Sequence, residues 1–503
     1  MRLSEALTAV GAVLRRRPAD LLPFYVLGVA VPAIARLVSF AGVAIAVLYL
    51  ETTGRFDVFF AEIGGHDLDP PNPETDPEAF GAWAESIAPL FEPLLTPVSV
   101  GLLVSSVTVT ALLVLVLTAA VSAGQLAACN SRLRDRRGLT AGIAGVRSHS
   151  VSFLGLYVLE GLLWLVVTSI AIGVVLVVAL VSFWAALVVA LVVTLLWLLT
   201  VVGIRAVFAF APVAVVVDDV GVGGSLRGSV EFIRVRSIDA VAYYLLAIGT
   251  LVGFGVLATA FSVLGIGTLA VLVGLFLVTP ALDLLRTALF AGFRGPISPP
   301  SWPAAAIPGQ LVKGVRRGWY ELRLFVRESP GFHVVAITSL GVGFWMGWVV
   351  AGPFVGHVET SIDARIAEIV PPTAAIEIFA NNWTVALSMA YAGVVLIVPT
   401  LAALWFNGFV FGLVGRLEVA PLELLAFVVP HGILEIPALL VSGSLGVYLG
   451  IIGWRTWRGS ADRTDLADAM ERAFWVLVGL GLVLAVAGFI EGFISPFYYR
   501  LLL

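Results

Sequence analysis

The chain is poor in charge, in cysteine and in lysine. Only 12% of its 503 residues are charged, about half the share found in an ordinary soluble domain. Cys129 is the single cysteine, which excludes an intrachain disulfide, a thiolate zinc cluster and a dithiol redox pair. Lys313 is the one lysine among 29 cations, and the formal net charge is -4. Because a nucleic-acid surface needs an excess of clustered cations, we expect no nucleic-acid partner.

Apolar residues take the place of the missing charge. They make up 60% of the sequence, the mean hydropathy is +1.04, and runs of eighteen or more apolar residues recur along the chain. Each such run is long enough to cross a hydrocarbon core of about 30 Å as a helix. The sequence therefore predicts an all-α polytopic transmembrane bundle of about eleven spans in two domains, surrounded by the lipid bilayer of the cell membrane.

The placement of charge predicts how the amino-terminal domain, residues 1–295, crosses the membrane. The segment 51–95 is acidic, whereas the stretch from Arg132 to Arg147 holds five arginines. By the positive-inside rule, the amino terminus and the arginine-rich loops face the cytoplasm, and the acidic segment is an outer loop. The amphipathic stretch from Asp218 to Asp239 is expected to form an interfacial helix. Six spans are predicted: about 21–50, 98–128, two within 151–217, 240–264 and 266–290.

Residues 296–331 are rich in proline at first and basic at their end, which predicts a cytoplasmic linker between two membrane domains. The following domain, residues 332–503, is predicted to hold five spans, so that the carboxy terminus lies outside. These spans are expected near 332–354, 383–400, 402–418 and 432–453, and in a last stretch that ends near Ser495.

Charged residues at bilayer depth cost about 2.5–3.5 kcal/mol by insertion scales, so each one predicts a partner or a function. In the amino-terminal domain, Glu160 and Arg205 lie at similar depths on antiparallel spans, and we predict a structural ion pair between them. Asp283 and Arg286 are one helical turn apart near the end of a span, where we expect a solvated pair.

The carboxy-terminal domain is predicted to hold an intramembrane cluster of five polar side chains, of which all but Asn407 are placed in the outer half of the bilayer. They are Asn382, Asn407, His431, Glu435 and Glu491. His431 and Glu435 are four residues apart, so a helix places them on one face, within reach of each other, a shared water or a metal. Two interpretations stay open: a polar site that opens outward, or an interhelical hydrogen-bond network that fixes the bundle.

Helix-breaking residues accompany this set. Pro430, Gly432 and Pro437 are predicted to break regular helix, which frees backbone groups that need partners in the membrane. Asn407 is expected to interrupt the preceding span, and Asn382 lies near the start of the span before that.

These residues together resemble the stage II sporulation protein M family, over about the last 170 residues of the chain. The resemblance is carried by Asn382, Asn407-Gly408, Pro430-His431-Gly432-Ile433-Leu434-Glu435-Ile436-Pro437-Ala438, Gly443, Gly446, and Glu491 ahead of Pro496. It implies a membrane domain of about five spans. In spore-forming bacteria the family acts with a wall hydrolase and another membrane protein during septal thinning and engulfment, but this chain carries no recognisable hydrolase domain.

A second similarity concerns the amino-terminal domain. The stretch from Arg205 to Pro212, followed by Val217-Asp218-Asp219 and by residues 225–229, is similar to six-span domains such as the membrane domain of glycerophosphodiester phosphodiesterases. The shared residues are mostly small and apolar, and no functional residue is carried over.

Three functions fit these residues. The first is a scaffold or assembly factor that recruits membrane or envelope protein partners in envelope or membrane remodelling. The second is a transporter or flippase for a small or lipid-like solute, with Asn382, His431, Glu435 and Glu491 along its path. The third, an intramembrane metal enzyme, is favoured least, because catalytic zinc normally needs three protein ligands. We therefore predict no enzyme, no metal and no cofactor, and an oligomer is left open.

Overall fold

The fold is built from helices. The computed structural model describes residues 2–63, 70–72, 75–356, 358–362, 366 and 370–498. Within these residues there is no strand, and the only β pairing is an isolated bridge between Thr360 and Glu418. The predicted all-α fold class is therefore confirmed.

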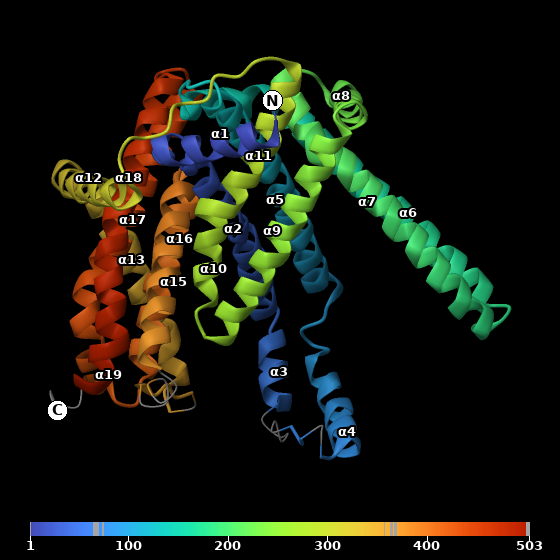
Figure 1. The fold of residues 1–503 in the computed structure, drawn as a ribbon. Helices are drawn as coiled ribbons and strands as arrows, with labels where there is room; N and C mark the ends of the chain where they lie inside the picture. The colour runs from blue at the N-terminus through green and yellow to red at the C-terminus, as the bar shows by residue number, and fades with distance from the viewer. Residues whose placement is uncertain are drawn as a thin grey trace. The chain divides into compact units, whose positions relative to one another are not determined.

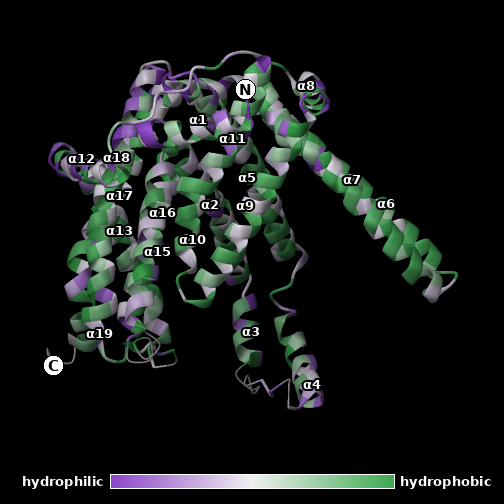
Figure 2. Cartoon of the chain, viewed as in Figure 1, coloured by the Kyte–Doolittle hydropathy of each residue, from purple (hydrophilic) through white to green (hydrophobic). Residues whose placement is uncertain are grey.

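Ten of the described helical segments are long and apolar enough to cross a membrane, six in the amino-terminal half and four in the carboxy-terminal half. They are α2 (Leu22–Thr52), α5 (Pro97–Arg132), α6 (Gly138–Ala179), α7 (Phe183–Asp218), α9 (Ser237–Val263), the run from α10 to α11 (Gly267–Arg294), α13 with η4 (Pro330–Phe354), α16 (Ile397–Leu417), α17 (Pro421–Trp457) and the run from α18 into α19 (Arg463–Phe497). Figure 2 shows how hydrophobic residues follow these helices along their length. The chain is thus a multi-pass membrane protein.

The eleventh predicted span corresponds to α15 (Pro371–Ala392), which is as long as α13 but less apolar because it carries a glutamate and two asparagines. Helices α10 (Gly267–Val273), α16, α17 and α18 (Arg463–Phe489) pack around it. Two of its polar groups, Glu377 and Asn382, therefore meet protein partners rather than lipid, which a membrane helix tolerates, whereas Asn381 is exposed. The boundaries predicted at 383–400 are wrong, since α15 ends earlier and α16 begins at Ile397.

The chain divides into two compact units, of which the smaller is Pro32–Leu115. It contains the later part of α2, the first part of α5 and the short helices between them: α3 (Arg55–Ile63), α4 (Pro77–Ile87) and η2 (Ala88–Phe91). The hydroxyls of Ser39 and Thr110 lie 3.0 Å apart and join its two long helices. The predicted acidic segment 51–95 belongs to this unit, and its residues 64–69, 73 and 74 lie outside the described part of the chain.

In the larger unit, α13 and α16 approach at very short range. A Cβ added to Gly343 would lie 2.0 Å from the carbonyl oxygen of Trp405, and one added to Gly408 would come equally close to the backbone of α13. Gly347 and Gly412, one turn further along, make matching contacts. Small residues spaced by four let two membrane helices pack backbone to backbone, so this pair forms a tight wall of the bundle.

The basic half of the predicted linker is a helix, α12 (Ile307–Glu328), which packs on α18 (Arg463–Phe489). A Cβ added to Gly479 of α18 would lie 2.4 Å from the carbonyl oxygen of Gly318. Beside this contact, Arg317 donates to the Glu471 carboxylate at 3.1 Å. The segment after residue 306 is therefore held along the bundle by backbone contact and by charge.

The amino-terminal and carboxy-terminal halves also touch inside the larger unit. The backbone N–H of Thr268 donates to the Glu377 carboxylate of α15 at 3.0 Å. The rings of Phe276 and Trp383 lie 5.4 Å apart between centroids. These contacts join helices of the two halves and do not show where one predicted domain ends and the next begins. The domain limits at 295 and 332 therefore stay a prediction.

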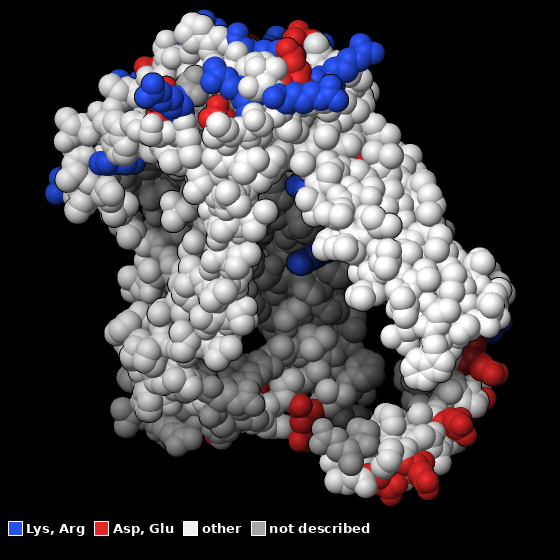
Figure 3. Space-filling view, turned by 45° about the vertical axis from the view of Figure 1, so that its right-hand side comes forward, with Lys and Arg blue, Asp and Glu red and all other residues white. Residues whose placement is uncertain are grey.

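Cationic side chains gather at one end of the larger unit (Figure 3). Figure 1 shows α1 (Leu3–Arg16) and α8 (Val222–Val235) at this end. α8 lies where the sequence predicts an interfacial helix, and one of its faces is buried through Ser225, Ser229 and Phe232. Short amphipathic helices beside a cationic surface are typical of the membrane interface.

Candidate functional site

The longest helix of the carboxy-terminal half, α17, carries two of the predicted site residues. It runs without interruption from Pro421 to Trp457 and includes Pro430, Gly432 and Pro437. The helix break predicted at these three residues is absent. A proline inside a helix removes one backbone hydrogen bond, and a membrane helix tolerates the loss where other helices pack around it.

Four of the predicted site residues converge between α15, α17 and the end of the chain. Asn382 Nδ2 donates to Glu435 Oε1 at 2.7 Å, which links α15 to α17. His431 Nε2 lies 4.0 Å from Glu491 Oε2, which links α17 to the last helical run. One imidazole nitrogen of His431 and one oxygen each of Glu435 and Glu491 lie within 4.8 Å of one another.

A fifth side chain, Ser495, belongs to the same set and was not predicted as a site residue. Its hydroxyl lies 3.1 Å from His431 Nδ1, and the residue is fully buried. Its spacing of four residues from Glu491 is the signal in the sequence that points to it, since such residues share a helix face. We name these five residues the polar cluster: Asn382, His431, Glu435, Glu491 and Ser495.

A π-helical turn, η5 (Ile490–Ile494), brings Glu491 to the polar cluster. It follows α18 directly and is pressed against α15. A Cβ added to Gly492 would lie 2.8 Å from both the backbone nitrogen and the Cβ of Ala375. π-turns inside longer helices are frequent at functional sites, where they change the direction of one side chain.

Asn407 does not join the polar cluster. Its Nδ2 donates to the carbonyl of Ala403, one turn earlier in α16, at 2.8 Å. No hydrogen bond or ion pair among the described residues joins it to the other four predicted residues. α16 continues through Asn407 to Leu417, so the predicted interruption is absent. Asn382 likewise lies in the middle of α15 rather than near the start of a span.

The polar cluster is mostly enclosed by protein, and His431 and Glu435 lie on a helix that is long and apolar enough to cross a membrane. His431 is 5% exposed and the Glu491 side chain is 22% exposed. His431 follows Pro421 by ten residues, which is about 15 Å along the helix axis. Among the described residues, no Lys or Arg side chain forms an ion pair with Glu435 or Glu491. The cluster thus holds two carboxyl groups and a histidine, without a lysine or arginine.

A second buried network lies in the amino-terminal half. Arg286 Nη2 lies 2.7 Å from Asp283 Oδ1 within α11 (Thr279–Arg294), and Asp283 is only 7% exposed. The expected solvated pair is therefore wrong. The Tyr25 hydroxyl donates to Asp283 at 3.0 Å and lies 3.3 Å from Cys129 Sγ. In this network the carboxylate has its cation one turn away on the same helix.

The predicted partners Glu160 and Arg205 lie on the neighbouring helices α6 and α7. Arg205 Nη1 is 3.0 Å from Glu160 Oε1. The Arg205 side chain is 62% exposed and the Glu160 side chain 14% exposed. The pair thus links two antiparallel helices at their surface, outside the polar cluster.

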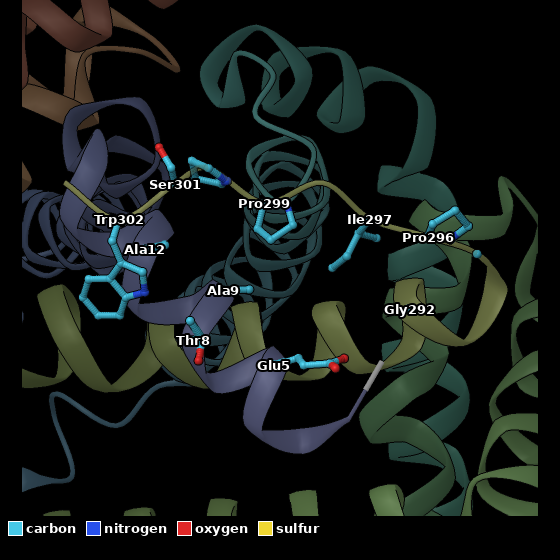
Figure 4. A pocket seen from close by; sticks show the side chains of 12 residues that line it. Glu5, Thr8, Ala9, Ala12, Gly292, Pro296, Ile297, Pro299, Ser301 and Trp302 are labelled. Carbon is cyan, nitrogen blue, oxygen red and sulfur yellow. The ribbon is translucent and has the colours of Figure 1, made fainter. Parts of the chain in front are cut away.

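A pocket of about 680 Å³ lies between α1, the end of α11 and residues 295–302 (Figure 4). The proline-rich start of the predicted linker crosses α1 here. Trp302 packs over Gly11, where an added Cβ would lie 2.9 Å from the ring, and the Arg15 guanidinium lies 4.8 Å from the ring centroid. Glu5 and Thr8 of α1 line the pocket, and none of the predicted site residues does.

The carboxy-terminal half matches a known family. The family model described as Stage II sporulation protein M matches residues 336–496, a range that contains the whole polar cluster. No curated protein and no solved structure matches the chain. The match does not extend into the amino-terminal domain. The similarity of that domain to glycerophosphodiester phosphodiesterase membrane domains is therefore not supported. The protein is thus a multi-pass integral membrane protein whose residues 336–496 are similar to the Stage II sporulation protein M family.

Proposed function

We propose that the protein is a membrane scaffold, an assembly factor that recruits membrane or envelope protein partners during envelope or membrane remodelling. The observation that carries the proposal is α12, an amphipathic basic helix that is fastened to the bundle on one side and exposed on the other. Such a helix offers a fixed surface on which a partner can dock.

The outer face of α12 combines apolar and cationic side chains. Leu311 is 64% exposed, Trp319 is 45% exposed and Tyr320 is 63% exposed. The exposed cations of the same helix include Lys313, Arg316, Arg323 and Arg327. Large aromatic residues with arginine are enriched where proteins bind one another, so the chemistry fits an acidic amphipathic segment of a partner.

The inner face of α12 is tied to α18 by ion pairs. Arg472 lies 2.6 Å from a Glu328 oxygen and 3.6 Å from a Glu321 oxygen. The Arg317 guanidinium lies 4.6 Å from the ring centroid of Trp475. Together with the glycine contact already described, these pairs support a rigid platform rather than a loose linker.

We further propose that this platform faces the cytoplasm, with the amino terminus on the same side and the carboxy terminus outside. The gathering of arginines around α1 and α8 supports this orientation, because cytoplasmic surfaces of membrane proteins carry an excess of arginine and lysine.

A transporter or flippase for a small or lipid-like solute is the second candidate. The polar cluster favours it, since titratable side chains at bilayer depth often line a solute or proton path. The continuous α17 counts against it, because transporters commonly build such sites from broken helices. The scaffold proposal therefore stays first.

Site-specific photocrosslinking tests the scaffold. A photoreactive amino acid placed at Trp319 in the full chain, in cells of the encoding organism, is expected to give discrete protein adducts. The same probe at Leu191 of α7, which is 75% exposed on a lipid-facing helix, serves as the matched control and is expected to label lipid. Labelling of lipid alone at both positions would contradict the scaffold.

Reconstitution separates the two candidate functions. Proteoliposomes with the wild-type chain and with Glu435→Gln are expected to scramble a fluorescent phospholipid at the same background rate. Scrambling that is faster with the wild type than with Glu435→Gln would favour the transporter instead.

A further inference from the structure

We propose that the polar cluster binds one divalent transition-metal cation through His431 Nε2 and one carboxylate oxygen each of Glu435 and Glu491. One imidazole nitrogen and two carboxylate oxygens form a donor set that suits Zn²⁺ or Mn²⁺. The single cysteine takes no part, because Cys129 is buried beside Tyr25 in the other network. The proposed metal site does not depend on the scaffold role, and a test of one does not decide the other.

The donor atoms already lie near the separations that a metal requires. One imidazole nitrogen of His431 and one oxygen of each carboxylate fall within 4.8 Å of one another, and His431 Nε2 is 4.0 Å from Glu491 Oε2. Around a tetrahedral metal with bonds of about 2.0–2.1 Å, neighbouring donors lie about 3.3 Å apart. Rotation of the two carboxylate side chains, by roughly 1 Å at their oxygens, closes the difference.

Outer hydrogen bonds hold two of the three ligands in place. When His431 Nδ1 carries the proton and donates it to the Ser495 hydroxyl, Nε2 keeps its lone pair on the side of Glu491. Asn382 donates to Glu435 Oε1 and leaves Oε2 without a hydrogen bond from it. Such partners orient the ligands of protein metal sites and raise their affinity.

The charge of the polar cluster also favours a bound cation. Two ionised carboxylates at bilayer depth are costly, and among the described residues no lysine or arginine pairs with them. A divalent cation compensates both charges at once. Two protonated, neutral acids would relieve the same cost without a metal, and this alternative is an outcome of the experiment below.

The site would have three protein ligands, which leaves at least one coordination position for water or a solute. In proteins, zinc with three ligands and an open position is typical of reactive sites, whereas purely structural zinc usually has four protein ligands.

Metal titration of the purified full chain tests the proposal. Chelator-washed protein in detergent is titrated with ZnCl₂ and, separately, with MnCl₂ by calorimetry. We expect one equivalent bound by the wild type and at least a 100-fold loss of affinity in Glu491→Gln and in Glu435→Gln. Asn382→Ala and Ser495→Ala are expected to lose about 10- to 100-fold, as outer partners typically do.

Glu377→Gln is the matched control, because Glu377 lies in the same bundle and accepts hydrogen bonds from Thr268 instead. It should bind the metal as the wild type does. The proposal would be overturned if Glu491→Gln and Glu435→Gln both bound the metal with wild-type affinity, or if the wild type bound neither metal stoichiometrically. Two protonated, neutral acids would then be the explanation for the polar cluster.

If the substituted chains fail to fold, the proposal can still be tested on the wild-type chain alone. The zinc X-ray absorption spectrum of the loaded wild-type chain should show oxygen and nitrogen ligands, including a single imidazole. A shell that contains sulfur, or more than one imidazole, would place the metal elsewhere and overturn the assignment.

Discussion

The two buried polar networks of this protein balance their charge in different ways. In the amino-terminal half, Asp283 has Arg286 one turn away on the same helix and Tyr25 as a donor. In the carboxy-terminal half, Glu435 accepts from the Asn382 amide and Glu491 lies beside His431, but neither glutamate pairs with a lysine or arginine among the described residues.

This difference separates a structural network from a candidate binding site. A buried carboxylate with its own arginine is complete, and removal of either partner leaves an uncompensated charge. Two carboxylates without a cation are incomplete, and their compensation must come from protons or from a ligand. The comparison therefore predicts that the first network governs stability and the second governs binding.

The largest effect is expected from Arg286→Met. It leaves the Asp283 carboxylate buried without its cation, which typically costs 3–5 kcal/mol. A denaturant titration in detergent micelles measures the free energy of unfolding. The double variant Asp283→Asn with Arg286→Met should regain part of this loss, because no charge is then left unpaired. A loss below about 1 kcal/mol in the single variant would show that the pair is not structural.

The next effect is expected from Gly492→Ala, which forces η5 away from Ala375. Overpacking of this kind typically costs 1–3 kcal/mol, and the displaced Glu491 should also bind Zn²⁺ more weakly. Gly161→Ala in α6 is the control, since nothing lies within 4 Å of its added Cβ. Equal zinc affinity in Gly492→Ala and the wild type would argue against positioning by the π-turn.

A smaller effect on stability is expected from Glu491→Gln measured in a chelator. It breaks no ion pair with a lysine or arginine, so the free energy of unfolding should change by less than about 1 kcal/mol. On addition of ZnCl₂, the melting temperature should rise for the wild type and stay constant for the variant. A large loss of stability in the chelator would make the polar cluster a structural network like the first one.

The smallest effect is expected from Glu160→Gln. Arg205 is mostly exposed, and interhelical polar contacts in membrane proteins average about 0.6 kcal/mol. Glutamine keeps one acceptor for Arg205, so the unfolding titration should show a change near that size. A loss as large as that of Arg286→Met would mean that exposure does not distinguish the two pairs.

Hydropathy predicted most of the helices, because an apolar run that crosses lipid shows itself in the sequence. It failed at α15 (Pro371–Ala392), whose boundaries were misplaced. Other helices surround α15, and a helix that faces protein does not need an apolar surface. The breaks predicted at Pro430 and Pro437 failed for a related reason, since packing around α17 tolerates the missing hydrogen bonds.

The candidate site was predictable in part. Spacing placed His431 and Glu435 on one helix face, and shared depth grouped them with Asn382 and Glu491. The rotation of one helix about its axis relative to its neighbours cannot be predicted from the local sequence. It turns Asn407 toward its own backbone and brings Ser495 to the histidine.

The most direct test of the proposed metal site is to locate the bound ion. A crystal of the full chain loaded with zinc and measured at the zinc absorption edge shows where the ion binds. We expect an anomalous peak about 2.0–2.2 Å from His431 Nε2 and from one oxygen each of Glu435 and Glu491. No peak at the polar cluster, with wild-type protein that is folded and zinc-saturated, would contradict it.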